Sequence, residues 1–245
     1  MFTFIAGIIL LATPFICMGL FSDKKRAFLY TLSFSLFFHT ASAFFLQLFG
    51  VFHYWTVFGV ALVAEILLFA FFLKKGLFKK YSFKISEISW IVFFVVIVAA
   101  VSLFHVHYNY TGKIGLATDK GLNHMQIENM VYPYPYFSDE WYSVALIQGT
   151  IESHSLPFHN TLNNSFFLNL QVFTHSFLAQ IMVLLGLDPL TQYSLLIVFF
   201  NTLMILVGFI FLRLCGVSEA VSGIAALSIL YATCGANLPG IWHLI

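Results

Sequence analysis

The sequence is poor in charged side chains. Only 9% of its 245 residues are charged and 60% are hydrophobic, whereas an ordinary soluble domain has about 25% charged residues. So little charge cannot coat a water-soluble globule. The net charge is +1 and no extended basic tract is present, so we expect no nucleic-acid partner.

Cysteine is scarce as well. The three cysteines, Cys17, Cys215 and Cys234, lie in or beside apolar stretches and form no CxxC pair. We therefore expect them to be small buried hydrophobic residues, which argues against a disulfide framework or a zinc site.

Long apolar runs dominate what remains. A membrane-spanning helix needs about 20 mostly apolar residues, and the sequence predicts an all-α, polytopic transmembrane bundle of about seven spans. The predicted spans are residues 2–21, 27–49, 55–73, 88–106, 166–186, 191–212 and 219–237. Gly186-Leu187-Asp188-Pro189 is predicted to end one helix and begin the next, because proline fits the first turn of a helix and not its interior.

Basic residues indicate how the chain is oriented. Lys24, Lys25 and Arg26 lie between the first two spans, and five lysines lie between the third and fourth. The positive-inside rule places both segments in the cytoplasm. The N-terminus and the long polar loop 107–165 are then extracytoplasmic, and we expect a multi-pass protein of the plasma membrane.

Two regions are predicted along the chain. Residues 1–87 form an N-terminal three-helix membrane addition with basic cytoplasmic loops, and residues 88–245 begin a membrane core that includes the outer loop. The chain stops at Ile245, directly after an apolar segment. This favours an N-terminal piece of a longer protein, with a complete seven-span protein as the alternative.

The outer loop holds the candidate chemistry. Residues 107–130 are polar with scattered glycine and are predicted to be irregular, whereas residues 139–153 have helical periodicity. We expect this helix to lie on the membrane surface with its apolar stripe (Trp141, Val144, Ile147 and Ile151) towards lipid. Asp139 and Glu140 would occupy its first turn, where acidic residues also act simply as complements to the helix dipole.

The residues around this acidic pair resemble a sequence pattern of a known family. Phe137-Ser138-Asp139-Glu140-Trp141-Tyr142, followed by an interfacial helix and Leu156-Pro157-Phe158-His159-Asn160, is similar to the GT-C superfamily of membrane glycosyltransferases. Protein O-mannosyltransferases and lipid A aminoarabinose transferases belong to it. The resemblance covers roughly residues 88–245, and the first three spans depart from the commonest layout of the family.

The resemblance implies transfer of a sugar from a polyprenyl-phosphate carrier on the outer side of the membrane. Asp139 would be the general base on the acceptor hydroxyl, with Glu140 as its neighbour. A divalent metal is possible, because some family members need one, but no metal ligands are assigned. The implied substrate-binding residues are His154, His159, Asn160 and the cations Lys113, Lys120 and Arg213.

Two other functions stay open. In a transporter or flippase, polar residues inside the predicted spans would line a pathway; these are Glu65, His39, His175 and Asn201. In a non-catalytic scaffold of the same architecture, the acidic pair would only cap its helix. Apart from transport, we expect the two histidines and the asparagine to form hydrogen bonds between helices, and Glu65 to be protonated or hydrogen-bonded against another helix.

Overall fold

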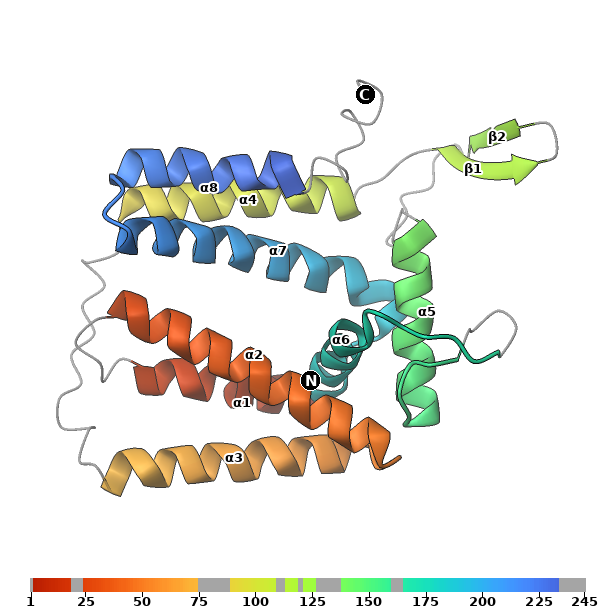
Figure 1. Cartoon of the computed structure of the whole chain (residues 1–245), viewed down its shortest axis with the longest axis horizontal. Coiled ribbons are helices and arrows are strands. Elements are labelled where there is room, and N and C mark those ends of the chain that lie inside the picture. The colour runs from red at the N-terminus through yellow and green to blue at the C-terminus, as the bar shows by residue number, and fades with distance from the viewer. Residues whose placement is uncertain are drawn as a thin grey trace. The chain divides into compact units, whose positions relative to one another are not determined.

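The computed structural model describes residues 2–18, 24–74, 89–108, 113–118, 121–126, 138–159 and 165–233. This part of the chain is helical apart from one hairpin (Figure 1). The helices are α1 (Phe2–Met18), α2 (Lys24–Leu48), α3 (Tyr54–Lys74), α4 (Trp90–Tyr108), α5 (Ser138–Ser153), α6 (Val172–Leu185), α7 (Pro189–Leu214) and α8 (Glu219–Thr233). Each predicted span overlaps one of these helices, although the span predicted for residues 166–186 begins six residues before α6.

Within the residues that the structure describes, three helices are long and apolar enough to cross a membrane. The qualifying segments are Lys25–Leu48, Tyr54–Phe71 and Pro189–Leu214, and the shorter apolar segments within the described residues are Thr3–Phe15, Trp90–Phe104, Val172–Leu185 and Glu219–Ser228. Trp55 and Trp90 lie in the first turns of α3 and α4, and 75% and 83% of their surface is exposed, as suits residues at a membrane–water interface. The chain is therefore a helical membrane protein, and the number of seven spans stays a prediction.

Part of the outer loop forms a β-hairpin. Strands β1 (Lys113–Thr118) and β2 (Gly121–Gln126) pair antiparallel, with Lys113 opposite Gln126. The prediction that residues 107–130 are irregular is therefore wrong for these twelve positions. Two residues separate the strands, the commonest hairpin length, but Asp119-Lys120 lacks the Asn-Gly or Asp-Gly signature by which such turns are recognised.

The chain divides into two compact units. The first combines residues 1–87 with 142–190, and the second combines residues 88–141 with 191–245. The predicted division into residues 1–87 and 88–245 stays a prediction. Residues 142–190, however, which the sequence places in the second region, pack with the three N-terminal helices.

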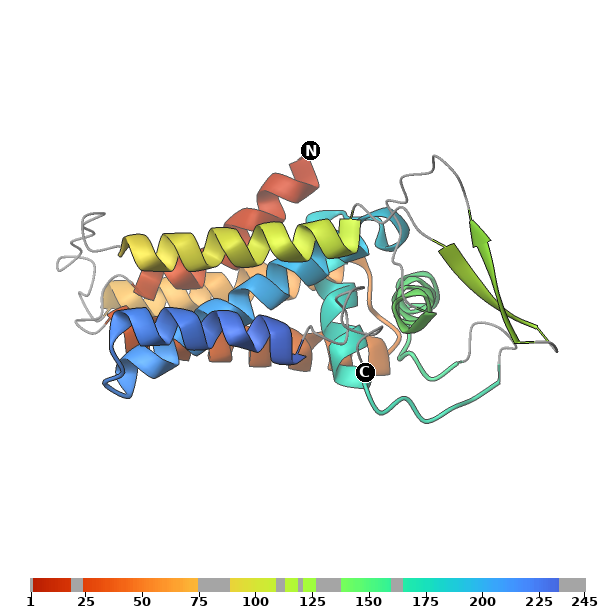
Figure 2. The ribbon, with the colours of Figure 1, turned by 90° about the horizontal axis from the view of Figure 1, so that it is seen from above.

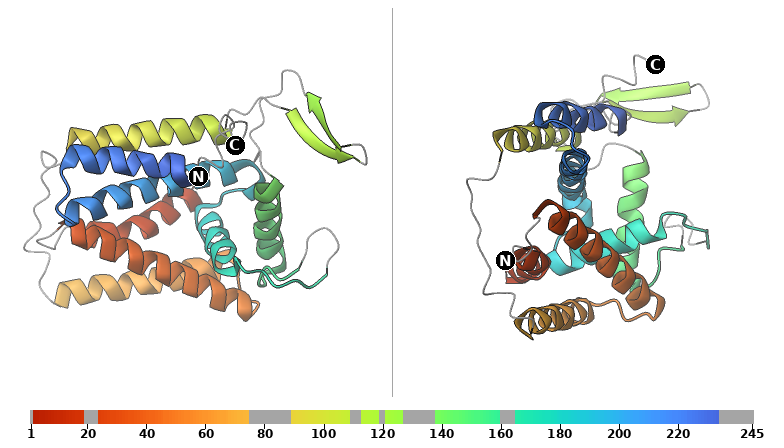
Figure 3. Two further views of the ribbon diagram at one scale, coloured as in Figure 1. Left: turned by 45° about the horizontal axis from the view of Figure 1, so that its top comes forward. Right: turned by 60° about the vertical axis from the view of Figure 1, so that its left-hand side comes forward.

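Helix α6 is the centre of the first unit, and it packs against α2 and α1 (Figures 1 and 3). Small side chains allow close approach: Ala43 of α2 and Ala179 of α6 are both fully buried. A Cβ atom added at Gly7 of α1 would lie only 2.4 Å from the backbone oxygen of Leu184. Close packing through small residues is the usual way in which helices associate in lipid.

Helices α4, α7 and α8 run alongside one another in the second unit (Figures 1 and 2). Apolar side chains from all three form one buried cluster: Val95, Ala99, Leu103, Val198, Ile205, Phe209 and Ala226. Gly223 of α8 faces α4, where an added Cβ atom would lie 3.1 Å from a methyl carbon of Ile91.

The predicted break between α6 and α7 is confirmed. Gly186 caps α6 in the left-handed conformation with φ 63°, which glycine adopts without steric cost. Pro189 then begins α7. The break lies close to α1, because a Cβ atom added at Gly186 would lie 2.8 Å from the Thr3 hydroxyl oxygen.

The expectation that all three cysteines are buried is wrong for Cys215, which is free and exposed. It directly follows the last residue of α7 and so lies outside the packed part of that helix. The side chains of Cys17 and Cys234 lie outside the described residues.

Candidate functional site

Helix α5 carries the acidic pair that the sequence singles out. The predicted helix 139–153 is confirmed as Ser138–Ser153, and it runs across the direction of α3 (Figures 1 and 2). If α3 crosses the membrane, α5 runs along the membrane plane. Asp139 and Glu140 lie in its first turn, and their side chains lie outside the described residues. Their catalytic roles stay a prediction.

The apolar side of α5 is covered by protein. Val144 and Ile147 are only 3% and 0% exposed, and Leu146 beside them is 2% exposed. The expectation that the stripe faces lipid is therefore wrong for Val144 and Ile147. The physical reason is that residues 142–153 of α5 pack within the first unit, so these apolar side chains have protein partners. The side chain of Trp141 lies outside the described residues.

A buried hydrogen-bond chain holds α5 against α6. Asn169 Nδ2 lies 3.0 Å from His175 Nδ1, and His175 Nε2 lies 3.3 Å from Ser143 Oγ. Since the amide nitrogen of asparagine can only donate, Nδ1 accepts and the neutral imidazole carries its proton on Nε2, which donates to Ser143. Asn169 Nδ2 also donates to the Pro157 carbonyl over 3.1 Å. One chain thus joins α5, the segment after it and α6.

A second contact fixes the C-terminal end of α5. His154 Nδ1 lies 2.8 Å from the Phe52 carbonyl oxygen, and the rings of His154 and His53 have centroids 3.8 Å apart. Because a carbonyl can only accept, Nδ1 carries the proton. The backbone of His154 is left-handed, with φ 58°, as at many helix ends. The end of α5 is therefore bound to the turn between α2 and α3, and the extracytoplasmic location of this turn stays a prediction.

The other predicted substrate-binding residues are scattered. His159 is exposed and pairs with Phe166 in an isolated β-bridge, and Asn160 and Lys120 lie outside the described residues. Lys113 begins β1, and its side chain is not among those described. Arg213 lies in the last turn of α7 and donates from Nη1 to the Val217 carbonyl, which suits a cation at a helix C-terminus.

These positions fall in different units. The three loop positions His154, His159 and Asn160 belong to the first unit, and Lys113, Lys120 and Arg213 to the second. A common site made from both sets therefore stays a prediction. Within the ranges that the structure describes, no group of three or more His, Cys, Asp or Glu residues could hold a metal ion, and a divalent metal also stays a prediction.

Polar side chains that sequence reasoning missed join α2 to α6. Gln180 Nε2 donates to His39 Nδ1 and to Ser42 Oγ, each over 2.9 Å, and Ser176 Oγ donates to Gln47 Oε1 over 2.6 Å. The expectation that His39 and His175 form hydrogen bonds between helices is confirmed. A signal existed, because Ser176 and Gln180 are spaced one turn apart in an apolar helix and so share a face.

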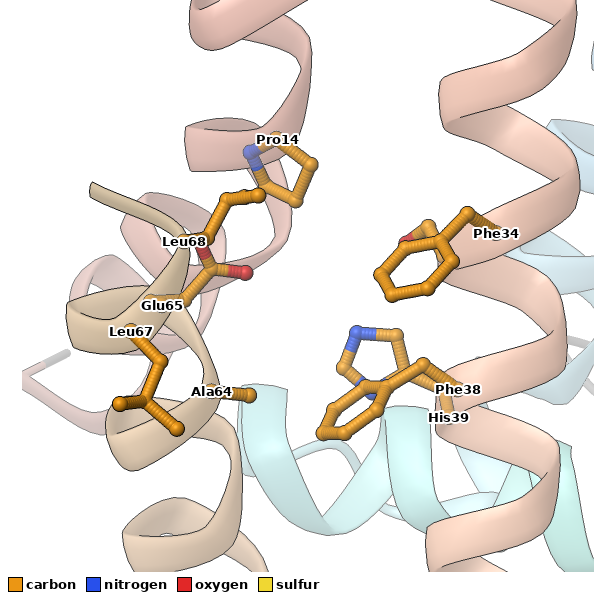
Figure 4. A pocket seen from close by; sticks show the side chains of 9 residues that line it. Pro14, Phe34, Phe38, His39, Ala64, Glu65, Leu67 and Leu68 are labelled. Carbon is orange, nitrogen blue, oxygen red and sulfur yellow. The ribbon is translucent and has the colours of Figure 1, made fainter. Parts of the chain in front are cut away.

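A pocket of about 340 Å³ lies between α1, α2 and α3 (Figure 4). It is lined by Pro14, Phe34, Ser35, Phe38, His39, Ala64, Glu65, Leu67 and Leu68. Glu65 Oε2 is buried and has no hydrogen-bond partner among the described residues. The expected hydrogen bond from Glu65 to another helix is therefore missing at this oxygen. Of the four residues considered for a transport pathway, Glu65 and His39 line the pocket.

No protein-family model, no curated protein and no solved structure matches the chain. The GT-C resemblance therefore stays an expectation from the sequence.

Proposed function

We propose that the chain is an integral membrane glycosyltransferase that moves a sugar from a polyprenyl-phosphate carrier to an acceptor outside the cytoplasm. One observation carries the proposal. Helix α5, whose first turn holds Asp139 and Glu140, lies across the direction of α3 and is bound to the α2–α3 turn. A helix in that position presents acidic side chains near the level of lipid head groups, where the phosphate of a carrier lipid resides.

The anchoring of α5 supports this use. His154 holds one end of the helix and Ser143 binds His175 near the other, and the rings of Tyr142 and Phe167 have centroids 5.9 Å apart. A catalytic carboxylate must be held within hydrogen-bond reach of its proton, and a helix fixed at both ends is suited to that task.

In the proposed reaction, the Asp139 carboxylate accepts the proton of the acceptor hydroxyl as its oxygen attacks the anomeric carbon. The bond from that carbon to the phosphate oxygen breaks, and the carrier leaves as polyprenyl phosphate. The charge on the leaving phosphate requires nearby cations, a role we assign to Lys113, Lys120 and Arg213. Glu140 is the neighbouring acid, and His154, His159 and Asn160 would line the acceptor side.

The test is sugar transfer in membranes that contain the full-length gene product and a panel of labelled polyprenyl-phosphate sugars. Asp139→Asn removes the base and should lower transfer at least about 100-fold, the lower range for general-base catalysis. Glu152→Gln is the matched control, an acid-to-amide change at the other end of α5. Glu152 is exposed and its Oε1 accepts from Gln148, so this variant should retain full transfer.

Two results would contradict the proposal. Full activity of Asp139→Asn at normal expression would show that Asp139 caps its helix and is not the base. Absence of transfer from every donor would favour the other functions. Transport is the stronger of these, because Glu65 and His39 line one pocket in the middle of α2 and α3, and a non-catalytic scaffold is the remaining one.

A further inference from the structure

The pocket between α1, α2 and α3 is lined mainly by apolar side chains, whereas the outer loop is polar. Both α2 and α3 contain segments long and apolar enough to span a membrane, and the pocket lies between their middle turns (Figure 4). Rings and aliphatic chains form most of its wall. Its volume of about 340 Å³ falls within the range of small-molecule sites, roughly 300–1,000 Å³.

The polar groups of the pocket have defined roles. Gln180 Nε2 donates to His39 Nδ1, so Nδ1 accepts and the neutral ring carries its proton on Nε2. Figure 4 shows the other ring nitrogen of His39 facing the gap, and the carboxyl group of Glu65 pointing into the same gap from α3. The pocket thus offers a hydrogen-bond donor on one wall. On the opposite wall it offers the carboxyl group of Glu65, whose oxygens accept hydrogen bonds.

These two groups select among ligand chemistries. A hydroxyl group can accept from His39 Nε2–H through its oxygen and donate its proton to the Glu65 carboxyl group. An ammonium group has only donors and leaves the imidazole N–H without an acceptor. An alkane satisfies neither group, although it fits the apolar wall. A buried polar atom left without a partner is unfavourable, so the hydroxyl is the group that completes the site.

We propose that this pocket binds a lipophilic alcohol, a hydrocarbon chain that carries a hydroxyl group, with the hydroxyl between His39 and Glu65. The hydrocarbon packs against Pro14, Phe34, Phe38 and the leucines of α3. This inference is independent of sugar transfer, because none of the pocket residues belongs to α5 or to the outer loop.

The test is photolabelling of the full chain in lipid nanodiscs with a long-chain alcohol that carries a diazirine. Labelled peptides are mapped by mass spectrometry, and dodecanol, dodecylamine and dodecane compete at equal concentration. We expect label on the α2 and α3 turns that line the pocket, displaced by dodecanol at least about fivefold more effectively than by the amine or the alkane. That ratio corresponds to about one hydrogen bond. Equal or better competition by the amine or the alkane would overturn the proposal.

Variants of Glu65 test the hydrogen bond itself. Glu65→Leu removes the acceptor and should weaken competition by dodecanol about five- to tenfold. Glu65→Gln keeps a carbonyl acceptor and should stay within about twofold of the parent protein. Unchanged competition in Glu65→Leu would overturn the proposal.

A matched pair of phenylalanine variants tests the location. Ala64→Phe fills the pocket and should abolish the specific label. Val63→Phe makes a similar change at a position that is 57% exposed and outside the pocket lining, and it should label normally. Loss of label in both variants, or in neither, would place the binding site elsewhere.

Discussion

The two compact units hold their helices together by different means. In the first unit, α2 and α6 meet through buried polar pairs, with Gln47 on Ser176 and Gln180 on His39. In the second, the cluster shared by α4, α7 and α8 is built from apolar side chains. In a membrane, moving an apolar side chain from lipid into protein gains little free energy, because both surroundings are apolar. Helix pairing therefore depends on hydrogen bonds and on close packing. The first unit uses both hydrogen bonds and close packing, whereas the described core of the second unit relies on close packing.

The largest expected effect is a cavity in the apolar cluster. Phe209→Ala should lower the free energy of unfolding in detergent by about 3 kcal/mol, because the emptied volume removes contacts that neighbours do not restore. Phe209 is only 4% exposed, whereas Phe211 on the same helix is 58% exposed. Phe211→Ala is therefore the control and should have a small effect. Equal losses would show that the cluster does not stabilise the second unit.

A close backbone contact gives the next effect. Gly7→Ala places a Cβ atom 2.4 Å from the Leu184 backbone oxygen, and α1 must move away from α6 at a cost of about 2 kcal/mol. Gly59→Ala, where nothing lies within 4 Å of the added atom, should not destabilise the protein. Thermal unfolding in detergent compares the two variants. A stable Gly7→Ala protein would contradict the close approach of α1 and α6.

The polar pairing between α2 and α6 should give a smaller, coupled effect. In a double-mutant cycle with Gln47→Leu and Ser176→Ala, we expect a coupling energy of about 0.6–1.7 kcal/mol, the size of such bonds between membrane helices. The reason is that the two side chains bind each other directly, over 2.6 Å. Additive effects of the two single changes would show that the polar pair does not hold these helices together.

Gly223→Ala should have the smallest effect. The added Cβ atom meets a methyl group of Ile91 at 3.1 Å, and a side chain can move by a few tenths of an ångström where a backbone oxygen cannot. We expect a loss below about 0.5 kcal/mol, measured by the same thermal unfolding. A loss of stability as large as that of Gly7→Ala would show that the two units tolerate an added Cβ atom equally poorly.

Local patterns in the sequence predicted the helices well and their partners poorly. Apolar runs located each predicted span, and Gly186 and Pro189 marked the break between α6 and α7. Helices that are apolar on all sides carry no amphipathic signal of which face meets protein. Nothing local therefore indicated that α6 packs with α1 and α2, or that Gln180 reaches His39 across 141 positions of the chain.

The candidate site shows the same division. The periodicity of residues 139–153 predicted α5, and the acidic pair followed from its place in the first turn. Periodicity could not show that Val144 and Ile147 face protein, because an apolar stripe looks the same against lipid and against another helix. The bond from His154 to Phe52 and the stacking on His53 join segments about one hundred residues apart, which no local pattern encodes.

By itself, the sequence determined that this is a helical membrane protein and roughly where its apolar helices lie, because hydrophobicity and helix-ending residues act over a few turns. Only the tertiary structure decided which helices pair, which polar side chains bind each other, and that Glu65 and His39 face one pocket. Those outcomes depend on contacts between distant segments, and they arise only when the chain has packed.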